Sequence, residues 1–292
     1  MKNTTSLFFF GFGQVAKSFV SKLKTEKTSF KITVTTREET KDKIYNGIPY
    51  KNFQLDENKF DRNLIKGLEQ SDHILISIPP VNEDDITLKY FKEIFKNKKF
   101  KWVTYLSATS VYGNHNGEWV DESSSTKPKS SNGIARLKAE KLWIEFANEY
   151  NLQLQIFRLS GIYSSQNNVL KRLKTGDVKI VKKKNQFFSR IHVEDIANIL
   201  FKSLKNFKKG EIYNISDDKP ASMEEVIDYG IKLIGTSKPK TIKIEEIESE
   251  MLKNFYKESK KVKNKKMKDF FKYNLKYPSY IEGLNYIYNN SV

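Results

Sequence analysis

Two glycines and an alanine form the pattern Gly11-x-Gly13-x-x-Ala16, between an apolar run and a segment with helical spacing. In such a pattern the first glycine permits a tight turn, the second lets the backbone approach a pyrophosphate, and the alanine allows close helix packing. The N–H groups of Gln14 and Val15, at the start of the helix, would then face the phosphates. The pattern predicts a dinucleotide-binding turn, and a plain tight turn is the alternative.

The next candidate residues follow the predicted strand Phe30 to Thr35. A protein that binds NAD usually has an acidic side chain here for the ribose 2′-hydroxyl, about 20 residues after the glycines. This chain has Thr36 and Arg37 instead, and a guanidinium beside hydroxyls suits a 2′-phosphate. We therefore expect NADP as the cofactor. NAD is the alternative, with Glu38 or Glu39 binding the ribose.

These residues need a scaffold that brings strand ends together, and the hydrophobic periodicity indicates one. Apolar strand-like runs alternate with amphipathic, helix-like segments through the first half of the chain. The alternation predicts a doubly wound parallel sheet, the Rossmann arrangement, with helices on both faces. Strands are expected at 7–10, 30–35, 73–78, 102–106 and 152–157, and helices at 15–23, 38–45, 86–95 and 133–150.

Two segments lie where the cofactor edge of that sheet is expected. Pro79 and Pro80 end the third strand, and we expect Pro79 to line the adenine and ribose side of the cofactor rather than to take part in chemistry. A long polar loop, 107–131, follows the fourth strand. Loops of this length in compact domains are often functional.

The alternation loosens in the second half of the chain. Short strand candidates at 178–181 and 211–215 mix with helices at 193–204 and 223–233. We expect a dinucleotide-binding Rossmann domain over 1–163 and a smaller, mixed α/β substrate lobe over 164–292. Segments at about 187–217 are expected to return to the first domain.

Six motifs follow one another along nearly the whole chain. They are Ser107-Ala-Thr-Ser-Val-Tyr-Gly113, Asp121-Glu122 with Pro128, Arg158-Leu-Ser-Gly-Ile-Tyr163, Arg190-Ile-His-Val-Glu-Asp-Ile-Ala197, Glu211-Ile-Tyr-Asn-Ile-Ser-Asp217 and Tyr277-Pro-Ser-Tyr-Ile-Glu-Gly283. Their order resembles the extended branch of the short-chain dehydrogenase/reductase superfamily, the NAD-dependent epimerase/dehydratase family. The last motif is similar to an atypical subgroup. The resemblance implies a Rossmann fold, a nicotinamide dinucleotide and a substrate lobe.

The catalytic positions of that family are replaced here. The family has Tyr-x-x-x-Lys at the start of the long helix, where the lysine and the nicotinamide ribose lower the tyrosine pKa for proton transfer. The resemblance aligns Asn132 with the tyrosine, Arg136 with the lysine, and Ala108 with the serine or threonine that binds the substrate. The candidate substitutes are Thr109 and Tyr112, although the corresponding tyrosine of relatives mostly lines the site.

Further residues are candidates for binding. Arg136 would hold the cofactor ribose, and a surface salt bridge to Glu140 one turn later is the alternative. Glu122 is a candidate substrate ligand, with a loop carboxylate or helix cap as the alternative. Asn132 and Arg190 are also candidates for binding the substrate, Arg190 as a phosphate clamp.

The chain of 292 residues has a formal net charge of +17. Its lysines are spread over the whole length and arginine is scarce, whereas proteins that read nucleic-acid sequence use arginine forks. We therefore expect a solvated, lysine-rich surface and no specific nucleic-acid partner; an anionic ligand, nucleic acid or an acidic partner is the alternative. The absence of cysteine excludes disulfides and thiolate chemistry.

No membrane or metal site is expected either. No apolar run approaches the roughly 20 residues of a membrane helix. The N-terminal apolar run is interpreted as a strand rather than a signal peptide, so a cytoplasmic location is expected. The histidines His73, His115 and His192 lack metal-ligand spacing, and His192 is expected to be structural.

These features predict an NADP-binding oxidoreductase or epimerase-like protein with a non-standard active site. The substrate would be a small polar molecule, and the resemblance points to nucleotide sugars. The alternative is a catalytically inactive NADP-binding protein that senses redox state or binds a partner. The resemblance also implies a homodimer through the long helix.

Overall fold

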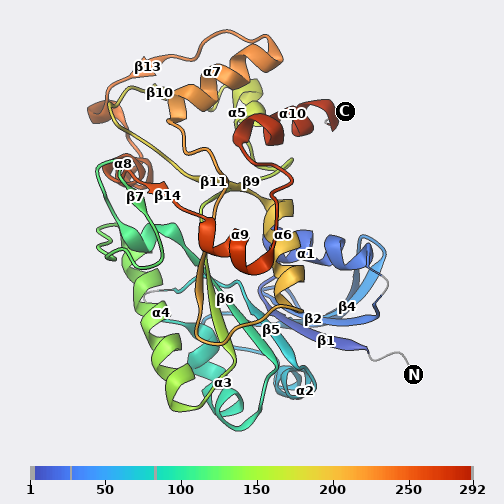
Figure 1. The fold of residues 1–292 in the computed structure, drawn as a ribbon. Coiled ribbons are helices and arrows are strands. Elements are labelled where there is room, and N and C mark those ends of the chain that lie inside the picture. The colour runs from blue at the N-terminus through green and yellow to red at the C-terminus, as the bar shows by residue number, and fades with distance from the viewer. Residues whose placement is uncertain (1–3, 27, 82–83, 291–292) are drawn as a thin grey trace. The chain divides into compact units, whose positions relative to one another are not determined.

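The computed structural model describes residues 4–26, 28–81 and 84–290. Its main feature is an eight-stranded sheet, made of β1 (Thr5–Phe10), β2 (Phe30–Thr36), β3 (Lys41–Tyr45), β4 (Ile48–Gln54), β5 (His73–Ile76), β6 (Trp102–Ala108), β8 (Leu154–Leu159) and β12 (Ile212–Ile215). The strands lie in the order β12-β8-β6-β5-β1-β2-β4-β3 (Figure 1). β1 pairs in parallel with β2 and β5, β2 with β4, and β5 with β6. The predicted doubly wound parallel sheet is confirmed, and its edge strand β3 pairs antiparallel with β4.

The chain divides into two compact units. Unit 1 comprises Met1–Ala108, Ile134–Arg158 and Ile196–Tyr213, and unit 2 comprises Thr109–Gly133, Leu159–Asp195 and Asn214–Val292. The two units interleave along the chain. The segment Ile196–Tyr213 joins unit 1 and lies within the expected returning segments, 187–217.

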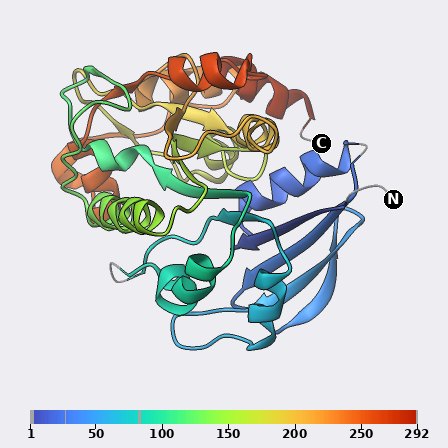
Figure 2. The same cartoon turned by 60° about the horizontal axis from the view of Figure 1, so that its bottom comes forward.

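Different helices cover the two faces of the sheet in unit 1 (Figure 2). Helices α2 (Asn63–Glu69), α3 (Ile86–Asn97) and α4 (Ser131–Glu149) share a core with Phe8 and Phe10. Helix α1 (Gln14–Lys24) covers the other face, where Phe19 stacks on Phe9 with ring centroids 5.6 Å apart. Because successive strand residues point to opposite faces, one apolar run supplies both cores.

A hairpin stands where a helix was expected at 38–45, so that prediction is wrong. Lys41–Tyr45 forms β3, which pairs antiparallel with β4. The two strands are joined by Asn46 and Gly47, with φ of 50° and 77°. A two-residue Asn-Gly turn adopts positive φ at both positions and matches the twist of paired strands. The hairpin replaces the helix that joins the second and third parallel strands in a regular dinucleotide fold.

Unit 2 has its own core and short parallel strand pairs. Helices α5 (Val169–Thr175), α7 (Met223–Ile234) and α10 (Tyr280–Asn290) share a core that includes Leu170, Ile227 and Leu284. The pairs are β9 (Gly161–Tyr163) with β11 (Arg190–His192), β10 (Ile180–Val181) with β13 (Thr241–Ile242), and β7 (Trp119–Val120) with β14 (Lys261–Val262). The other elements are η1 (Thr109–Tyr112), α6 (Val193–Ser203), η2 (Ile244–Glu246), α8 (Glu250–Lys257) and α9 (Lys265–Phe271); α6 runs on into unit 1.

Candidate functional site

The glycine turn after β1 needs a glycine at its first position. Gly11 has φ of 93°, and a Cβ added there would lie 2.7 Å from Ser77 Oγ. Its N–H donates to Thr35 Oγ1 at 3.0 Å. The turn is thus held between the ends of β2 and β5, at the carboxyl edge of the sheet.

Gly13 has a different environment from Gly11. It is the N-cap of α1 in an extended conformation, with no side chain capping the helix and no acidic residue in the first turn. A Cβ added to Gly13 would meet nothing within 4 Å. Open space therefore lies beside the start of α1, where Gln14 and Val15 carry the first helical N–H groups. This is the space that a pyrophosphate needs.

The residues after β2 differ in how they are engaged. Thr36 Oγ1 donates to Asn52 Oδ1 at 2.9 Å and accepts the N–H of Glu38 at 3.2 Å. Glu38 forms an ion pair with Lys43 of β3. Arg37 is exposed, and within the described residues its guanidinium has no ion-pair partner. A ligand would therefore not have to break an ion pair to reach the charge of Arg37.

Pro79 lies on the exposed segment that leaves β5. Ser77, two residues earlier, bonds the glycine turn: its N–H and its hydroxyl both donate to the carbonyl of Phe10, at 2.8 and 2.9 Å. These bonds keep the segment with Pro79 next to the glycine turn.

Arg136 lies at the end of β6 and does not pair with Glu140. Its Nη1 donates to the carbonyl of Leu106 at 2.7 Å. Glu140 is buried and binds Arg158 instead, so the alternative of a surface Arg136–Glu140 salt bridge is wrong. The Arg136 side chain is thus half-buried at the carboxyl end of a central strand.

A close approach holds the start of α4 against η1. A Cβ added to Gly133 would lie 2.8 Å from both the carbonyl of Ser110 and the Cβ of Pro128. Asn132, the preceding residue, is exposed, and Thr109, at the start of η1, is half-buried. Within the described residues the Thr109 hydroxyl makes no hydrogen bond. The amide of Asn132 and the hydroxyl of Thr109 are therefore both accessible in this part of unit 2.

Tyr112 and Glu122 are both engaged with Asn214 of β12. The buried Tyr112 hydroxyl donates to Asn214 Oδ1 at 2.8 Å. Asn214 donates its N–H to Glu122 Oε1 at 2.7 Å and its side-chain amide to the carbonyl of Lys263 at 3.2 Å. Burial raises the pKa of the Glu122 carboxyl. The contacts favour structural roles for Tyr112 and Glu122; sequence reasoning missed Asn214, which lies inside the Glu211–Asp217 motif.

Arg190 is also engaged within the protein. Its side chain is buried, and Nη1 donates to the carbonyls of Phe188 and Ala221 at 2.9 and 3.0 Å. Burial raises the pKa of the Asp217 carboxyl well above its usual value, and the charge of Arg190 opposes this rise without cancelling it. These bonds fasten two loops of unit 2, so a phosphate would have to compete with them for the guanidinium.

His192 is held as a neutral ring. Its Nδ1 accepts the N–H of Glu194 at 3.3 Å, and its ring lies 4.1 Å from that of Tyr277. Burial lowers the pKa of His192 to about 4. In the described part of the chain, no three His, Cys, Asp or Glu side chains are grouped as metal ligands. Nor does any helix there combine the length and apolarity needed to cross a membrane.

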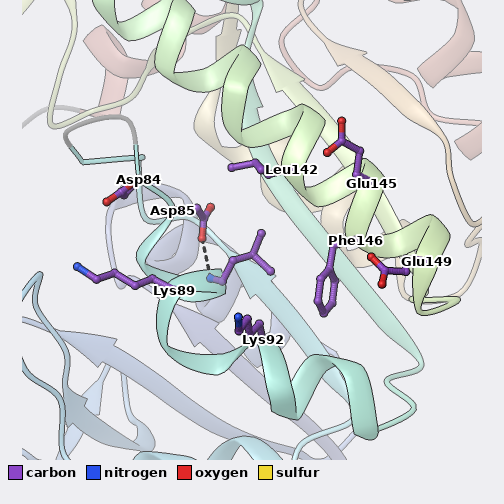
Figure 3. Close-up of a pocket in the computed structure, with 9 residues that line it drawn as sticks. Asp84, Asp85, Lys89, Lys92, Leu142, Glu145, Phe146 and Glu149 are labelled. Atoms are coloured by element: carbon purple, nitrogen blue, oxygen red, sulfur yellow. Dashed lines mark hydrogen bonds between the residues drawn. The ribbon is translucent and has the colours of Figure 1, made fainter.

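A separate cavity of about 440 Å³ lies between α3 and α4 (Figure 3). The buried carboxyl of Asp85 accepts the N–H groups of Thr87 and Leu88 and the Nε1–H of Trp143, the last at 2.8 Å. None of the predicted site residues lines it. The lining residues are Asp84, Asp85, Leu88, Lys89, Lys92, Leu142, Glu145, Phe146 and Glu149.

Comparison with known proteins identifies the family. Residues 85–216 match the NAD dependent epimerase/dehydratase family. A functionally unknown conserved protein from Silicibacter pomeroyi DSS is similar in structure, with 31% identity, a TM-score of 0.86, and coverage of 98% of this chain and 99% of that one. The chain belongs to the NAD-dependent epimerase/dehydratase family.

More distant structures share the fold. UDP-glucuronic acid 4-epimerase from Bacillus cereus, solved with NAD, has 18% identity and a TM-score of 0.78, covering 98% of both chains. The dTDP-glucose 4,6-dehydratase of Bacillus anthracis str. Ames, also with NAD, has 16% identity and a TM-score of 0.77, covering 98% of this chain and 96% of that one. No curated protein matches the sequence.

Proposed function

We propose that this protein binds NADP and acts as an oxidoreductase or epimerase-like enzyme on a polar, nucleotide-sugar-like substrate. The observation that carries the cofactor assignment is the end of β2, where Arg37 has no ion-pair partner among the described residues and Glu38 is paired with Lys43. A 2′-phosphate would find a guanidinium there, whereas Glu38, one of the two carboxylates that could bind a 2′-hydroxyl, is already engaged.

The residues of unit 1 fit a dinucleotide. The open space beside Gly13 would take the pyrophosphate, with the N–H groups of Gln14 and Val15 facing it. Thr36 and Arg37 would hold the 2′-phosphate, Pro79 would border the adenosine, and Arg136 would bind the nicotinamide ribose. When bound, the nicotinamide supplies a hydride acceptor or donor at its C4.

The substrate would meet the polar groups of unit 2. Its class is suggested by distant structural neighbours, which include a UDP-glucuronic acid 4-epimerase solved with UDP-glucuronic acid and NAD. Asn132 is exposed, and its amide can hydrogen-bond a substrate hydroxyl. Glu122 and Arg190, which were also expected to bind substrate, hold backbone groups of unit 2 and would act by shaping it.

Proton transfer needs a different solution from that of the family. Thr109 can orient a substrate oxygen, but neither a threonine hydroxyl nor an asparagine amide titrates near neutral pH. Tyr112 would have to give up its bond to Asn214 to act as an acid. We therefore assign the proton to water or to the substrate, with Thr109 and Asn132 positioning the carbon–oxygen bond.

Binding and turnover test these assignments separately. Titration with NADPH and NADH should show tighter binding of NADPH, and Arg37→Ser should remove most of the difference. Tighter NADH binding by the wild type would contradict the assignment of NADP. Turnover is measured by following transfer of the reduced-nicotinamide hydrogen to a panel of carbonyl compounds and nucleotide sugars.

A second candidate function is that of a catalytically inactive NADP-binding sensor. It is favoured by the joint replacement at Ala108, Asn132 and Arg136, and by the engagement of Tyr112 with Asn214. Its signature would be tight NADPH binding with no hydrogen transfer to any compound of the panel. Any transfer that depends on Thr109 or Asn132 would exclude it.

A homodimer through α4 is part of the proposal. Ile134 and Leu142 on that helix are 43% and 40% exposed, a large value for apolar side chains. Figure 3 shows Leu142 and Phe146 at the cavity between α3 and α4, with Lys89 on α3 and Glu145 on α4 as flanking charges. Sedimentation should give twice the chain mass, and Leu142→Glu should give monomers.

A further inference from the structure

The hairpin β3–β4 brings a lysine to the strand end where cofactor preference is decided. Lys43 lies opposite Tyr50, and residues opposite each other in an antiparallel pair share one face of the sheet. Tyr45, two residues after Lys43, is on the same face. Both tyrosine rings contact Phe12, which stands between the two glycines, with centroid distances of 4.7 Å for Tyr50 and 5.6 Å for Tyr45. The face that carries Lys43 therefore packs against the glycine turn.

Lys43 binds Glu38, the first acidic residue after β2. Its ammonium donates a hydrogen bond to Glu38 Oε2. This bond is the main reason that the pKa of Glu38 is lowered and that of Lys43 is raised, so both groups stay charged at neutral pH. Lys41 and Lys17 lower the pKa of Glu38 further. The carboxylate thus lies in the field of three ammonium groups.

We propose that Lys43 is a specificity-determining residue, which favours NADP by holding Glu38; this inference rests on the proposed binding of NADP. A carboxylate after the second strand can accept hydrogen bonds from the 2′-hydroxyl of NAD, and it repels a 2′-phosphate. Lys43 offsets that charge and occupies the carboxylate, which leaves Arg37 to bind the phosphate. Lys43 acts through Glu38 and is a positioning residue, without needing to touch the cofactor.

The test is the ratio of the dissociation constants for NAD and NADP, measured by calorimetry on the full chain. Lys43→Met should lower this ratio by about fivefold, the effect of one exposed charge interaction. Adding Glu38→Gln should return the ratio to within about twofold of wild type, because the released carboxylate is then absent. Lys43→Arg should keep the wild-type ratio, since it keeps the ion pair.

A matched control separates the ion pair from net charge. Lys51→Met removes one lysine from the same hairpin. It also breaks an exposed ion pair, in which Lys51 Nζ lies 3.4 Å from Asp42 Oδ1. Its ratio should equal that of the wild type. An equal fall in Lys51→Met would assign the effect to net charge and overturn the role of Lys43.

The remaining outcomes distinguish this inference from the proposed function. If the wild type prefers NADP and Lys43→Met leaves the ratio unchanged, the role of Lys43 is overturned and NADP binding stands. If the wild type binds neither cofactor, the proposed function itself is overturned. Thermal melts of every variant identify those that fail to fold, and the Lys43→Arg rescue then supplies the decisive comparison.

Discussion

Arg158 of β8 donates hydrogen bonds to both carboxylate oxygens of Glu140 in α4, Nε to Oε1 at 3.0 Å and Nη2 to Oε2 at 2.7 Å. The two side chains are only 6% and 1% exposed. The pair fixes the long helix to a strand inside unit 1. Arg158 is the first residue of the Arg158–Tyr163 motif, and these contacts give it a structural role.

Breaking this pair should destabilise the protein strongly. Glu140→Gln removes one charge and leaves the buried guanidinium uncompensated, which should cost about 3 to 5 kcal/mol in the free energy of unfolding. Urea unfolding measures the change. Adding Arg158→Met should recover part of the loss, because no buried charge then remains. Asp42→Asn, which breaks the exposed pair with Lys51, is the control and should cost less than about 1 kcal/mol.

The two glycines of the turn should respond differently to alanine. Gly13→Ala meets open space, so its free energy of unfolding should fall by less than about 1 kcal/mol. Its affinity for NADP should fall by at least about tenfold, because the methyl group enters the space assigned to the pyrophosphate. Gly11→Ala combines a positive φ with a clash against Ser77 and should cost about 1 to 3 kcal/mol. Unchanged NADP affinity in Gly13→Ala would argue against the turn as the phosphate site.

Tyr112 and Thr109 can be separated by stability. Tyr112→Phe takes the hydroxyl donor from the buried Asn214 amide, which should cost about 1 to 3 kcal/mol. Thr109→Val removes a hydroxyl that has no hydrogen-bond partner in the described structure, so unfolding should change little. If the protein turns over a substrate, Thr109→Val should slow turnover while leaving stability nearly unchanged. Tyr112→Phe should lower stability more than it slows turnover. The reverse result, with Tyr112→Phe inactive at unchanged stability, would make Tyr112 the proton donor.

His192 should make the free energy of unfolding depend on pH below neutrality. Its pKa is about 4 in the folded protein, below the 6.5 of a free histidine, so folding favours the neutral ring. The stabilisation of the folded state by the neutral His192 ring is fully present above pH 6.5. It is lost as the pH falls from 6.5 to 4, a total of roughly 3 kcal/mol. His192→Phe keeps an aromatic ring against Tyr277 and should flatten the profile in this window. Tyr286→Phe, a change in the same aromatic cluster, should leave it in place.

The sheet could be predicted from the sequence because its signals are local. The apolar runs that became β1, β5, β6 and β8 are short, continuous and bounded by polar residues, which is typical of strands buried on both faces. The glycine turn lies between a strand-like run and a helix-like segment, so its position between the first strand and the first helix could be predicted. Asn132 and Arg136 were located by motif spacing, and the structure sets them one turn apart on α4.

Two kinds of feature were not predicted. One is the strand β3, which a local turn signal indicates; the other is contacts between residues far apart in the sequence. Asn46-Gly47 is a strong hairpin signal, and weighing it against the helix-like composition of 38–45 would have predicted β3. No local pattern indicates that Tyr112 and Glu122 meet at Asn214, which is 92 residues from Glu122 along the chain. The same holds for Arg190, whose carbonyl partners include Ala221, 31 residues away. Such partners emerge only when the chain is folded.

The interleaved units also matter on the ribosome. Unit 1 is completed by Ile196–Tyr213, yet the chain between Arg158 and Ile196 belongs to unit 2. At about 5 to 20 residues per second, translation from Arg158 to Tyr213 takes roughly 3 to 11 s. Throughout that interval β8 cannot pair with β12, its neighbour at the sheet edge, because β12 has not yet been synthesised. A nascent chain thus exposes an unfinished strand edge, which is open to pairing with another chain, for several seconds.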